Sequence, residues 1–290
     1  MVFSISRLNR DYFLGNSSSL RFRDFFVSCS ILTINLLKMK KLVVLLFLTT
    51  SLSFAQVINT RMITVDRGMN QKFESGVEKK TKMYNSKEGQ LRFYTFRITA
   101  GPNMDKYFRV RYEDNLKGFD TKPTKEALKM WNDQVGDLMT NSNGRWFGLN
   151  KNASNITVSP FSKPLRRVME YNYKSHKSGD FWRFRNNVAK AIRESKADIF
   201  MEVWNCASGC DGNLAMIVFG HANYEEFGTD NSVEWRKVYD KYNELFGENS
   251  YETDIASFSE SLEIYGRKVY NMEFLPEMSS PEKMSKLDKL

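Results

Sequence analysis

Charged and aromatic side chains recur at alternating positions along several apolar stretches of this 290-residue chain. The guanidinium group of arginine binds carboxylates and phosphates through paired N–H donors, and glutamate offers a matching acceptor. Seven residues of these stretches are candidate ligand-binding positions: Arg97, Arg109, Arg111, Glu170, Glu202, Trp204 and His221. Their chemistry is that of a polar site for an anionic ligand.

The side chains of a strand point alternately to its two faces. Arg97, Arg109 and Arg111 alternate with aromatic and aliphatic residues, so we expect them on the face away from the helices. Glu202 and Trp204 are expected to face them from a second sheet, with Glu170 and His221 as further candidates on that side. One interpretation is an anion-binding cleft. The alternative is that arginine and glutamate pair with each other and hold the sheets closed, because buried charges are almost always paired.

His221 is one of only two histidines in the chain. A histidine at this position could act as a general base near neutral pH or as an axial haem ligand. The alternative is a hydrogen-bonded structural residue at the end of a strand. His221 is thus the one candidate catalytic residue, and no cofactor is expected unless the haem alternative holds.

Cys206 and Cys210 lie in the loop between two apolar strands. A zinc site would need two further ligands, which two histidines supply poorly, and a redox pair is more typical of C-x-x-C at the start of a helix. The sequence therefore predicts a disulfide between them and no metal site.

The order of predicted elements repeats. The first copy has strands at 57–65, 91–99, 106–112 and 146–149, with helices at 69–84 and 124–139. The second has strands at 165–173, 198–205, 214–220 and 268–275, with helices from 178, from 232 and within 249–265. Each copy reads β-α-β-β-α-β, a ferredoxin-like arrangement. The predicted domains are therefore 56–149 and 165–276, joined by a polar linker at 150–164 and followed by a polar, frayed tail at 277–290.

This order resembles the dimeric α+β-barrel superfamily, which includes antibiotic-biosynthesis-monooxygenase-like and NIPSNAP-like proteins. The likeness rests on the order of elements, the turn Gly101–Asn103 and the loop Tyr112–Asp114, echoed at Tyr224–Glu226. It implies α+β architecture: two tandem ferredoxin-like domains whose antiparallel sheets pack face to face as a barrel around a cleft. Members of that superfamily include haem enzymes, cofactor-free oxygenases and modules without a reaction.

The N-terminal region reads as an export signal. Met39–Lys41 is basic, Leu42–Leu48 is apolar, and Ser53–Ala55 is a small-x-small cleavage site. We expect 39–55 to be a signal peptide, 1–38 to be an upstream extension preceding the true start, and the mature chain to begin at Gln56. The apolar run is too short to span a bilayer, so the prediction is a periplasmic or secreted protein without a membrane span.

Charge argues against nucleic acid as a partner. The chain carries a net +9, but residues 1–55 contribute +5 of it, and the remaining +4 is spread without a basic block. We expect an exported protein that binds a small molecule or a protein partner in its inter-sheet cleft, as a monomer with an internal pseudo-dimer or as a homodimer. The alternative is an oxygenase or haem-dependent enzyme of the α+β-barrel type.

Overall fold

A computed structural model describes residues 56–229 and 231–282. Its strands are β1 (Val57–Val65), β2 (Tyr94–Ala100), β3 (Tyr107–Glu113), β4 (Met139–Leu149), β5 (Leu165–Tyr173), β6 (Phe200–Ser208), β7 (Leu214–His221) and β8 (Leu262–Phe274). Its α-helices are α2 (Asn70–Tyr84), α3 (Lys125–Val135), α4 (Ser178–Ser195), α5 (Tyr224–Thr229), α6 (Ser232–Phe246) and α7 (Ser250–Ser261). The expected extension and signal peptide lie outside the described residues. Within the described part, no helix is long and apolar enough to cross a membrane.

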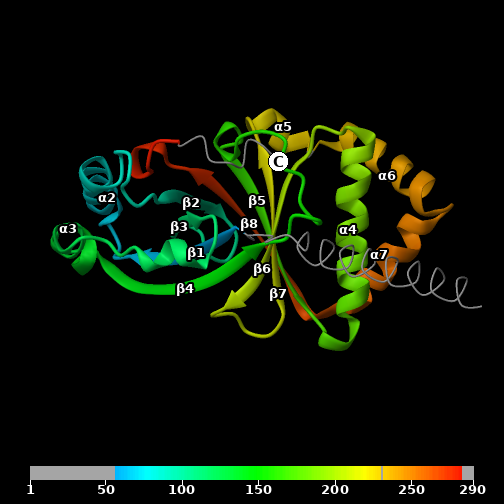
Figure 1. Cartoon of the computed structure of the whole chain (residues 1–290), viewed down its shortest axis with the longest axis horizontal. Coiled ribbons are helices and arrows are strands. Elements are labelled where there is room, and N and C mark those ends of the chain that lie inside the picture. The colour runs from blue at the N-terminus through cyan, green and yellow to red at the C-terminus, as the bar shows by residue number, and fades with distance from the viewer. Residues whose placement is uncertain (1–55, 230, 283–290) are drawn as a thin grey trace, which may run out of the picture. The chain divides into compact units, whose positions relative to one another are not determined.

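The eight strands form one closed antiparallel barrel in the order β1-β3-β2-β8-β5-β7-β6-β4 (Figure 1). The first four strands in sequence lie in the order β4-β1-β3-β2, and the last four repeat that order as β8-β5-β7-β6. Two seams join the halves: β2 pairs with β8, and β4 pairs with β6. The expected fold class, ferredoxin-like units that build an α+β barrel, is confirmed.

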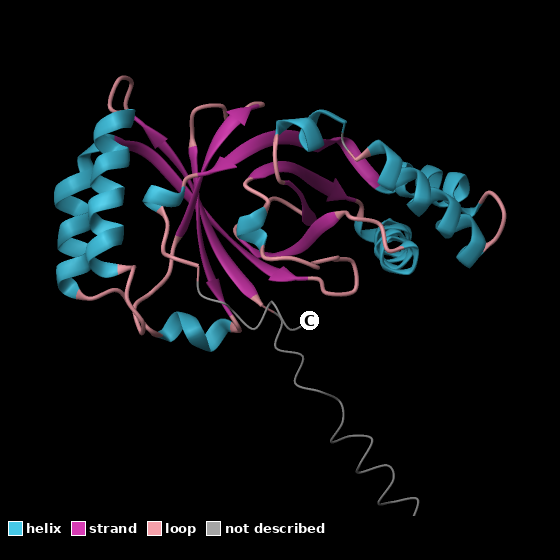
Figure 2. Ribbon diagram, turned by 90° about the horizontal axis from the view of Figure 1, so that it is seen from above, coloured by secondary structure: helices cyan, strands magenta, loops and turns pink. Residues whose placement is uncertain are grey.

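Helices cover the outside of the barrel in two separate groups. Figures 1 and 2 both show α2 and α3 on one side, with α4, α6 and α7 on the opposite side. The start of α3 illustrates the local cause, since the Thr124 hydroxyl caps the helix by accepting from the Ala127 N–H at 3.2 Å. The central strands of each half are thus covered by helices outside and by the other half inside, whereas parts of β4 and β8 are exposed.

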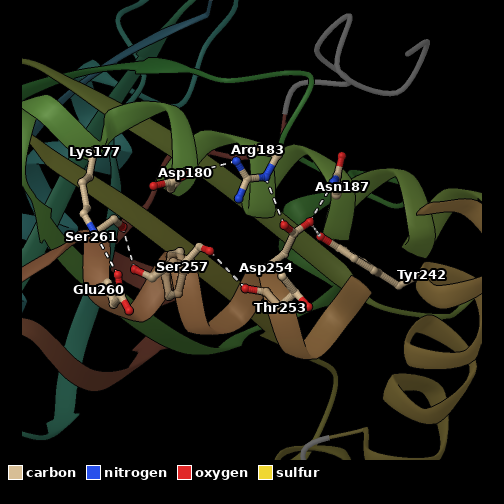
Figure 3. Close-up of polar contacts among 11 residues, drawn as sticks. Lys177, Asp180, Arg183, Asn187, Tyr242, Thr253, Asp254, Ser257, Glu260 and Ser261 are labelled. Atoms are coloured by element: carbon tan, nitrogen blue, oxygen red, sulfur yellow. Dashed lines mark hydrogen bonds and ion pairs between the residues drawn. The ribbon is translucent and has the colours of Figure 1, made fainter. Parts of the chain in front are cut away.

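A carboxylate at the centre of the second helix group ties its three helices together. Asp254 of α7 accepts from the Arg183 side chain of α4 at 3.0 Å and from the Tyr242 hydroxyl of α6 at 2.6 Å (Figure 3). Asn187, also on α4, donates to the same carboxylate at 3.3 Å. These contacts fix the helices that support β5, β6 and β7.

Four expectations about the elements need correction. β4 starts at Met139 and β8 at Leu262, both earlier than expected, because Val65 pairs with Met139 and Tyr173 pairs with Leu262. α5 lies where a loop was expected. The first residues of the expected frayed tail are packed instead, since Met278 is buried in the core beneath α2.

Candidate functional site

The three candidate arginines share one face, but it is the face that the helices cover. The β3 residues Phe108 and Val110 point into the barrel and join its apolar core, so Arg109 and Arg111 point outward. The expectation that these arginines face the other sheet is therefore wrong. Alternation predicts which side chains share a face of a strand. Here the more apolar set of side chains points into the barrel, and the set that includes the arginines points toward the helices.

Each of these arginines has partners on the outer face. Arg97 forms an ion pair with Glu74 of α2. Arg111 donates to Glu113 at 2.7 Å and to the backbone carbonyl of Gly118 at 2.7 Å. Arg109 is buried, and it donates to the Thr95 hydroxyl and to backbone. None of the three belongs to the interior of the barrel.

Glu170, Glu202 and Trp204 do face the interior, as expected. The Oε1 atom of Glu170 accepts from Nη1 of Arg145 of β4 at 2.9 Å and from the Tyr270 hydroxyl at 3.3 Å. This is the ion pair across the two halves that the structural alternative predicted, with a different arginine. Glu170 therefore has a structural role.

Glu202 lines an internal cavity of about 10 Å³, which has room for about one water molecule. Most of the wall is apolar, and its four polar or amphipathic members come from three different strands. The lining residues are Ile58, Phe96, Phe108, Val110, Tyr112, Arg166, Glu202, Trp204, Met216, Val218 and Met272. The cavity thus lies inside the barrel and is built by both halves.

Two residues that line this cavity each have one buried side-chain atom without a hydrogen-bond partner among the described residues: Nη1 of Arg166 and Oε1 of Glu202. Arg166 is 3% exposed, and Glu202 is also 3% exposed. A buried donor or acceptor that stays unsatisfied costs about 1–3 kcal/mol, and more when it is charged. The pair therefore marks a place where a further polar group would be stabilised.

The position of Arg166 depends on a small residue beside it. Arg166 pairs in register with Gly220 of β7, and its guanidinium stacks over the Phe200 ring at 4.8 Å. A Cβ atom at Gly220 would lie 2.6 Å from Arg166 Nη1. Because glycine has no Cβ atom, the guanidinium of Arg166 can occupy this space.

Burial dominates the electrostatics of the site. It raises the pKa of the Glu202 carboxyl, an effect that the charge of Arg166 and a hydrogen bond from Trp204 oppose. Burial likewise lowers the pKa of Arg166. It also raises the pKa of the Tyr112 hydroxyl well above its ordinary value, with Glu202 adding to the shift. The site therefore combines a cation, a carboxyl that ionises less readily than usual and a neutral phenol.

The segment between the two halves closes the barrel at the end where β5 begins. Phe161, in a 3₁₀ turn at Pro160–Ser162, lies with its ring 4.6 Å from Tyr94 and 5.3 Å from Phe274. Arg166 donates through Nη2 to the carbonyl of Pro160. The expected linker thus reaches the candidate site directly.

His221 lies away from this cavity. Its neighbours on β7 at the same alternation, Ala215 and Ile217, belong to the helix-side core, and its ring lies 5.1 Å from that of Phe227 in α5. The cavity lining contains no histidine or cysteine and has room for about one water molecule. These residues do not fit a haem, so we derive no step through one. In the described part of the chain, no group of three His, Cys, Asp or Glu side chains could hold a metal ion.

Cys206 and Cys210 form the predicted disulfide. Both residues pack against the apolar core of the barrel, at the end where β7 begins.

The sequence pattern did not identify Arg166 and Tyr112 as candidate site residues. Arg166 has the same alternation as Glu170, so the argument that placed Glu170 inside would also have placed Arg166 there. Tyr112 was grouped with the apolar set, and that set is the one that faces the cavity.

A separate groove of about 1010 Å³ runs between the segment after β4 and the end of α4. Three basic residues line it, and one of them, Arg193, already donates to the backbone carbonyls of Ser154 and Asn152. This groove has no buried unsatisfied side chain in its lining, among the described residues. It is therefore the weaker candidate site.

No family model matches the chain, and no curated protein matches its sequence. Its structure is similar to that of a proposed monooxygenase from Lactobacillus acidophilus NCFM, with TM-score 0.50 and 12% identity over 78% of this chain and 96% of the other. A proposed monooxygenase from Fusobacterium nucleatum subsp. nucleatum aligns with TM-score 0.53 and 11% identity, over 76% and 93%. Chlorite dismutase from Candidatus Nitrospira defluvii gives TM-score 0.47 and 9% identity, over 79% and 94%.

At such identities the likeness shows a shared fold and not a shared activity. The two neighbours described as monooxygenases share the fold of this chain. The NIPSNAP link and the origin of the two halves as a tandem pair stay predictions.

Proposed function

We propose that the barrel binds a small, mostly apolar molecule with one hydroxyl group, an aromatic alcohol or an enol, at Arg166 and Glu202. The observation that carries the proposal is a pair of unsatisfied buried atoms, Arg166 Nη1 and Glu202 Oε1, on two residues that line one cavity. A hydroxyl satisfies both, because its hydrogen can be donated to the carboxylate while its oxygen accepts from the guanidinium.

The apolar wall supports the rest of this assignment. Ligand sites are mostly apolar, with a few polar groups that fix orientation, and the cavity has Phe96, Phe108 and Trp204 among its lining residues. The cavity has room for about one water molecule. A larger ligand can therefore enter only if the end of the barrel where β5 begins opens. The Phe161 turn is the segment that we expect to move.

The test compares two ligands that differ in one hydroxyl group, p-cresol and toluene, by titration calorimetry. Hydrogen bonds to charged groups contribute about 1.5–3 kcal/mol, so we expect p-cresol to bind roughly ten- to a hundredfold more tightly. Glu202→Gln and Arg166→Met should remove that preference. The control is Glu263→Gln, at an exposed position of β8, which should keep it. Equal binding of the two ligands would overturn the proposal.

A second candidate function follows from the same residues. A buried carboxyl with a raised pKa beside a cation is suited to take a proton from an enol or phenol, whose anion Arg166 would stabilise. The anion can then react with dioxygen. For a CH₂ group beside the enol the balance is CH₂ + O₂ → C=O + H₂O, and the substrate supplies the electrons. Two fold neighbours described as monooxygenases favour keeping this candidate.

Oxygen uptake distinguishes the two functions. With 2-indanone as the probe and no added reductant, an oxygenase should consume one O₂ for each substrate molecule, and Glu202→Gln should abolish the uptake. Binding of p-cresol without any oxygen uptake would leave the binding function alone.

We also propose that the mature protein is exported. The basic-apolar-small pattern at 39–55 supports this, as does the Cys206–Cys210 disulfide, because disulfides persist in oxidising compartments. Expression of the full chain in a bacterium should give a periplasmic product whose mass starts at Gln56. An uncleaved chain in the cytosol would contradict export without affecting the binding proposal.

A further inference from the structure

Three cationic side chains lie around one tryptophan on the outer face of the first half of the barrel. None of them lines the barrel cavity. Arg61 of β1, Lys80 of α2 and Arg109 of β3 lie 6.0, 6.0 and 5.5 Å from the centroid of the Trp131 ring. Lys80 and Arg109 also lie over the Phe93 ring, at 4.8 and 5.0 Å. We call Arg61, Lys80 and Arg109 the cation cluster.

Every hydrogen-bond acceptor of the cation cluster is a neutral group. Arg61 donates to the Ser142 hydroxyl at 2.8 Å, and Lys80 donates to the Asn85 side-chain carbonyl at 2.5 Å. Arg109 donates to the Thr95 hydroxyl at 2.5 Å and to the backbone carbonyl of Met278 at 3.0 Å. Among the described residues, no carboxylate forms an ion pair with any of the three.

This lack of a counter-charge is unusual for buried groups. Lys80 is 5% exposed and Arg109 is 4% exposed, and buried charges in proteins are almost always paired or bound to an ion. A cation over an aromatic face gains about 0.5–2 kcal/mol. That gain is smaller than the several kcal/mol that burial of each ion costs, and the three cations also repel one another.

The pKa values of Lys80 and Arg109 are both lowered, as expected for buried cations that lack a counter-charge. Burial, and then the charge of Arg109, lower the pKa of Lys80 to about 7. Burial and the nearby Arg61 lower the pKa of Arg109. An anion at the cluster would remove the repulsion that these shifts reflect.

We propose that the cation cluster binds one small oxyanion, a phosphate or a carboxylate, against the wall formed by Trp131. Lys80 has three N–H donors, and the bond to Asn85 uses only one of them. Arg61 and Trp131 are half-buried, so the anion enters from their side. A phosphate accepts from all three cations at once, whereas a carboxylate offers two oxygens.

The test is calorimetric titration of the full protein with inorganic phosphate and, separately, with acetate, against sodium chloride at matched ionic strength. We expect saturable binding of phosphate, of acetate or of both. The arm that saturates identifies the oxyanion. Saturation by neither would overturn the proposal.

Variants assign the binding to these residues. Lys80→Met should weaken it at least about tenfold, the loss of one buried charge pair. Lys79→Met is the matched control, because Lys79 is the exposed neighbour on the same helix, and it should change affinity by less than about twofold. If Lys80→Met fails to fold, Arg61→Gln, at a half-buried position, replaces it as the variant that should weaken anion binding.

Binding that survives both Lys80→Met and Arg61→Gln would also overturn the proposal. Glu202→Gln should leave phosphate binding intact, since the cluster lies outside the barrel. The two proposals can therefore fail separately.

Discussion

The ring of Phe161 lies 4.6 Å from the ring of Tyr94, and this contact joins the segment between the two halves to the first half of the barrel. The same segment is held to the second half through Arg166, which donates to the Pro160 carbonyl. The Pro160 carbonyl accepts from Nη2, whereas the ligand is proposed to bind at Nη1 of the same guanidinium. One side chain therefore contacts both the segment that closes this end of the barrel and the proposed ligand position.

Removing the Phe161 ring should open the barrel. Phe161→Ala is expected to raise the association rate of p-cresol, measured by stopped-flow fluorescence, and to cost about 1–3 kcal/mol of unfolding free energy, because the ring is only partly buried. Phe246→Ala, a partly buried phenylalanine of the second helix group, should cost a similar amount without changing the association rate. Equal rates in all three proteins would exclude this entry route.

Neutralising Glu202 should stabilise the protein at neutral pH. Its folded pKa is raised, so the native state holds the proton more tightly than the unfolded chain, and stability falls as pH rises through that interval. Glu202→Gln has no such loss. Its advantage over the parent in urea unfolding should be present at pH 7 and vanish below about pH 4, the ordinary range of a glutamate.

Glu170→Gln should have the opposite effect. It removes the negative charge that pairs with Arg145 and leaves a single side-chain acceptor for Arg145 and the Tyr270 hydroxyl. Because Arg145 is partly exposed, we expect a loss of about 1–3 kcal/mol. If both glutamine variants were equally stable at pH 7, the distinction between the satisfied and the unsatisfied glutamate would be wrong.

The stability difference between the parent and Lys80→Met should depend on pH. Lys80 has a folded pKa of about 7 against 10.5 for an ordinary lysine, because of burial first and then the charge of Arg109. The unfolded state therefore binds more protons between these values, and the parent gains stability as pH rises from 7 to about 10. In chloride buffer, Lys80→Met should be the more stable protein at pH 6, with an advantage that shrinks toward pH 10. A constant difference would contradict the lowered pKa.

A methyl group at Gly220 should disturb the site sterically. The Cβ would meet Arg166 Nη1 at 2.6 Å and the Phe200 ring at 2.8 Å. Overpacking of this kind costs about 1–3 kcal/mol, and p-cresol binding should fall with it. Gly148→Ala is the control, since a Cβ there meets nothing within 4 Å. Calorimetry and urea unfolding of the two variants measure both effects, and normal binding by Gly220→Ala would contradict the role assigned to Arg166.

The sequence was sufficient for local structure and for the fold. β1 and β5 have the limits that alternation predicted, and the repeated order of elements implied the barrel. Alternation also separated Arg109 and Arg111 from Phe108 and Val110 correctly. It could not say which set faces the helices, because both faces of this sheet are buried, and that choice depends on packing between distant segments.

Other parts of the site depend on long-range contacts that no local pattern carries. Phe161 lies in a polar segment with two prolines, and only the closure of the barrel places it against Tyr94 and Phe274. The early start of β8 is likewise set by its pairing with β5. Arg166 was within reach of the sequence, since its alternation with Val168 and Glu170 was already visible.

The order of strands also determines when the barrel can be completed during folding. The first half leaves the edges of β2 and β4 unpaired, and exposed edges of this kind are prone to pair with other chains. The edge of β4 is covered when β6 forms, but that of β2 waits for β8, where Phe96 meets Phe274. Contacts so distant in sequence form slowly. Until β8 pairs with β2, the folding chain therefore carries an unpaired strand, and loss of the last strand alone would leave a protein that tends to aggregate.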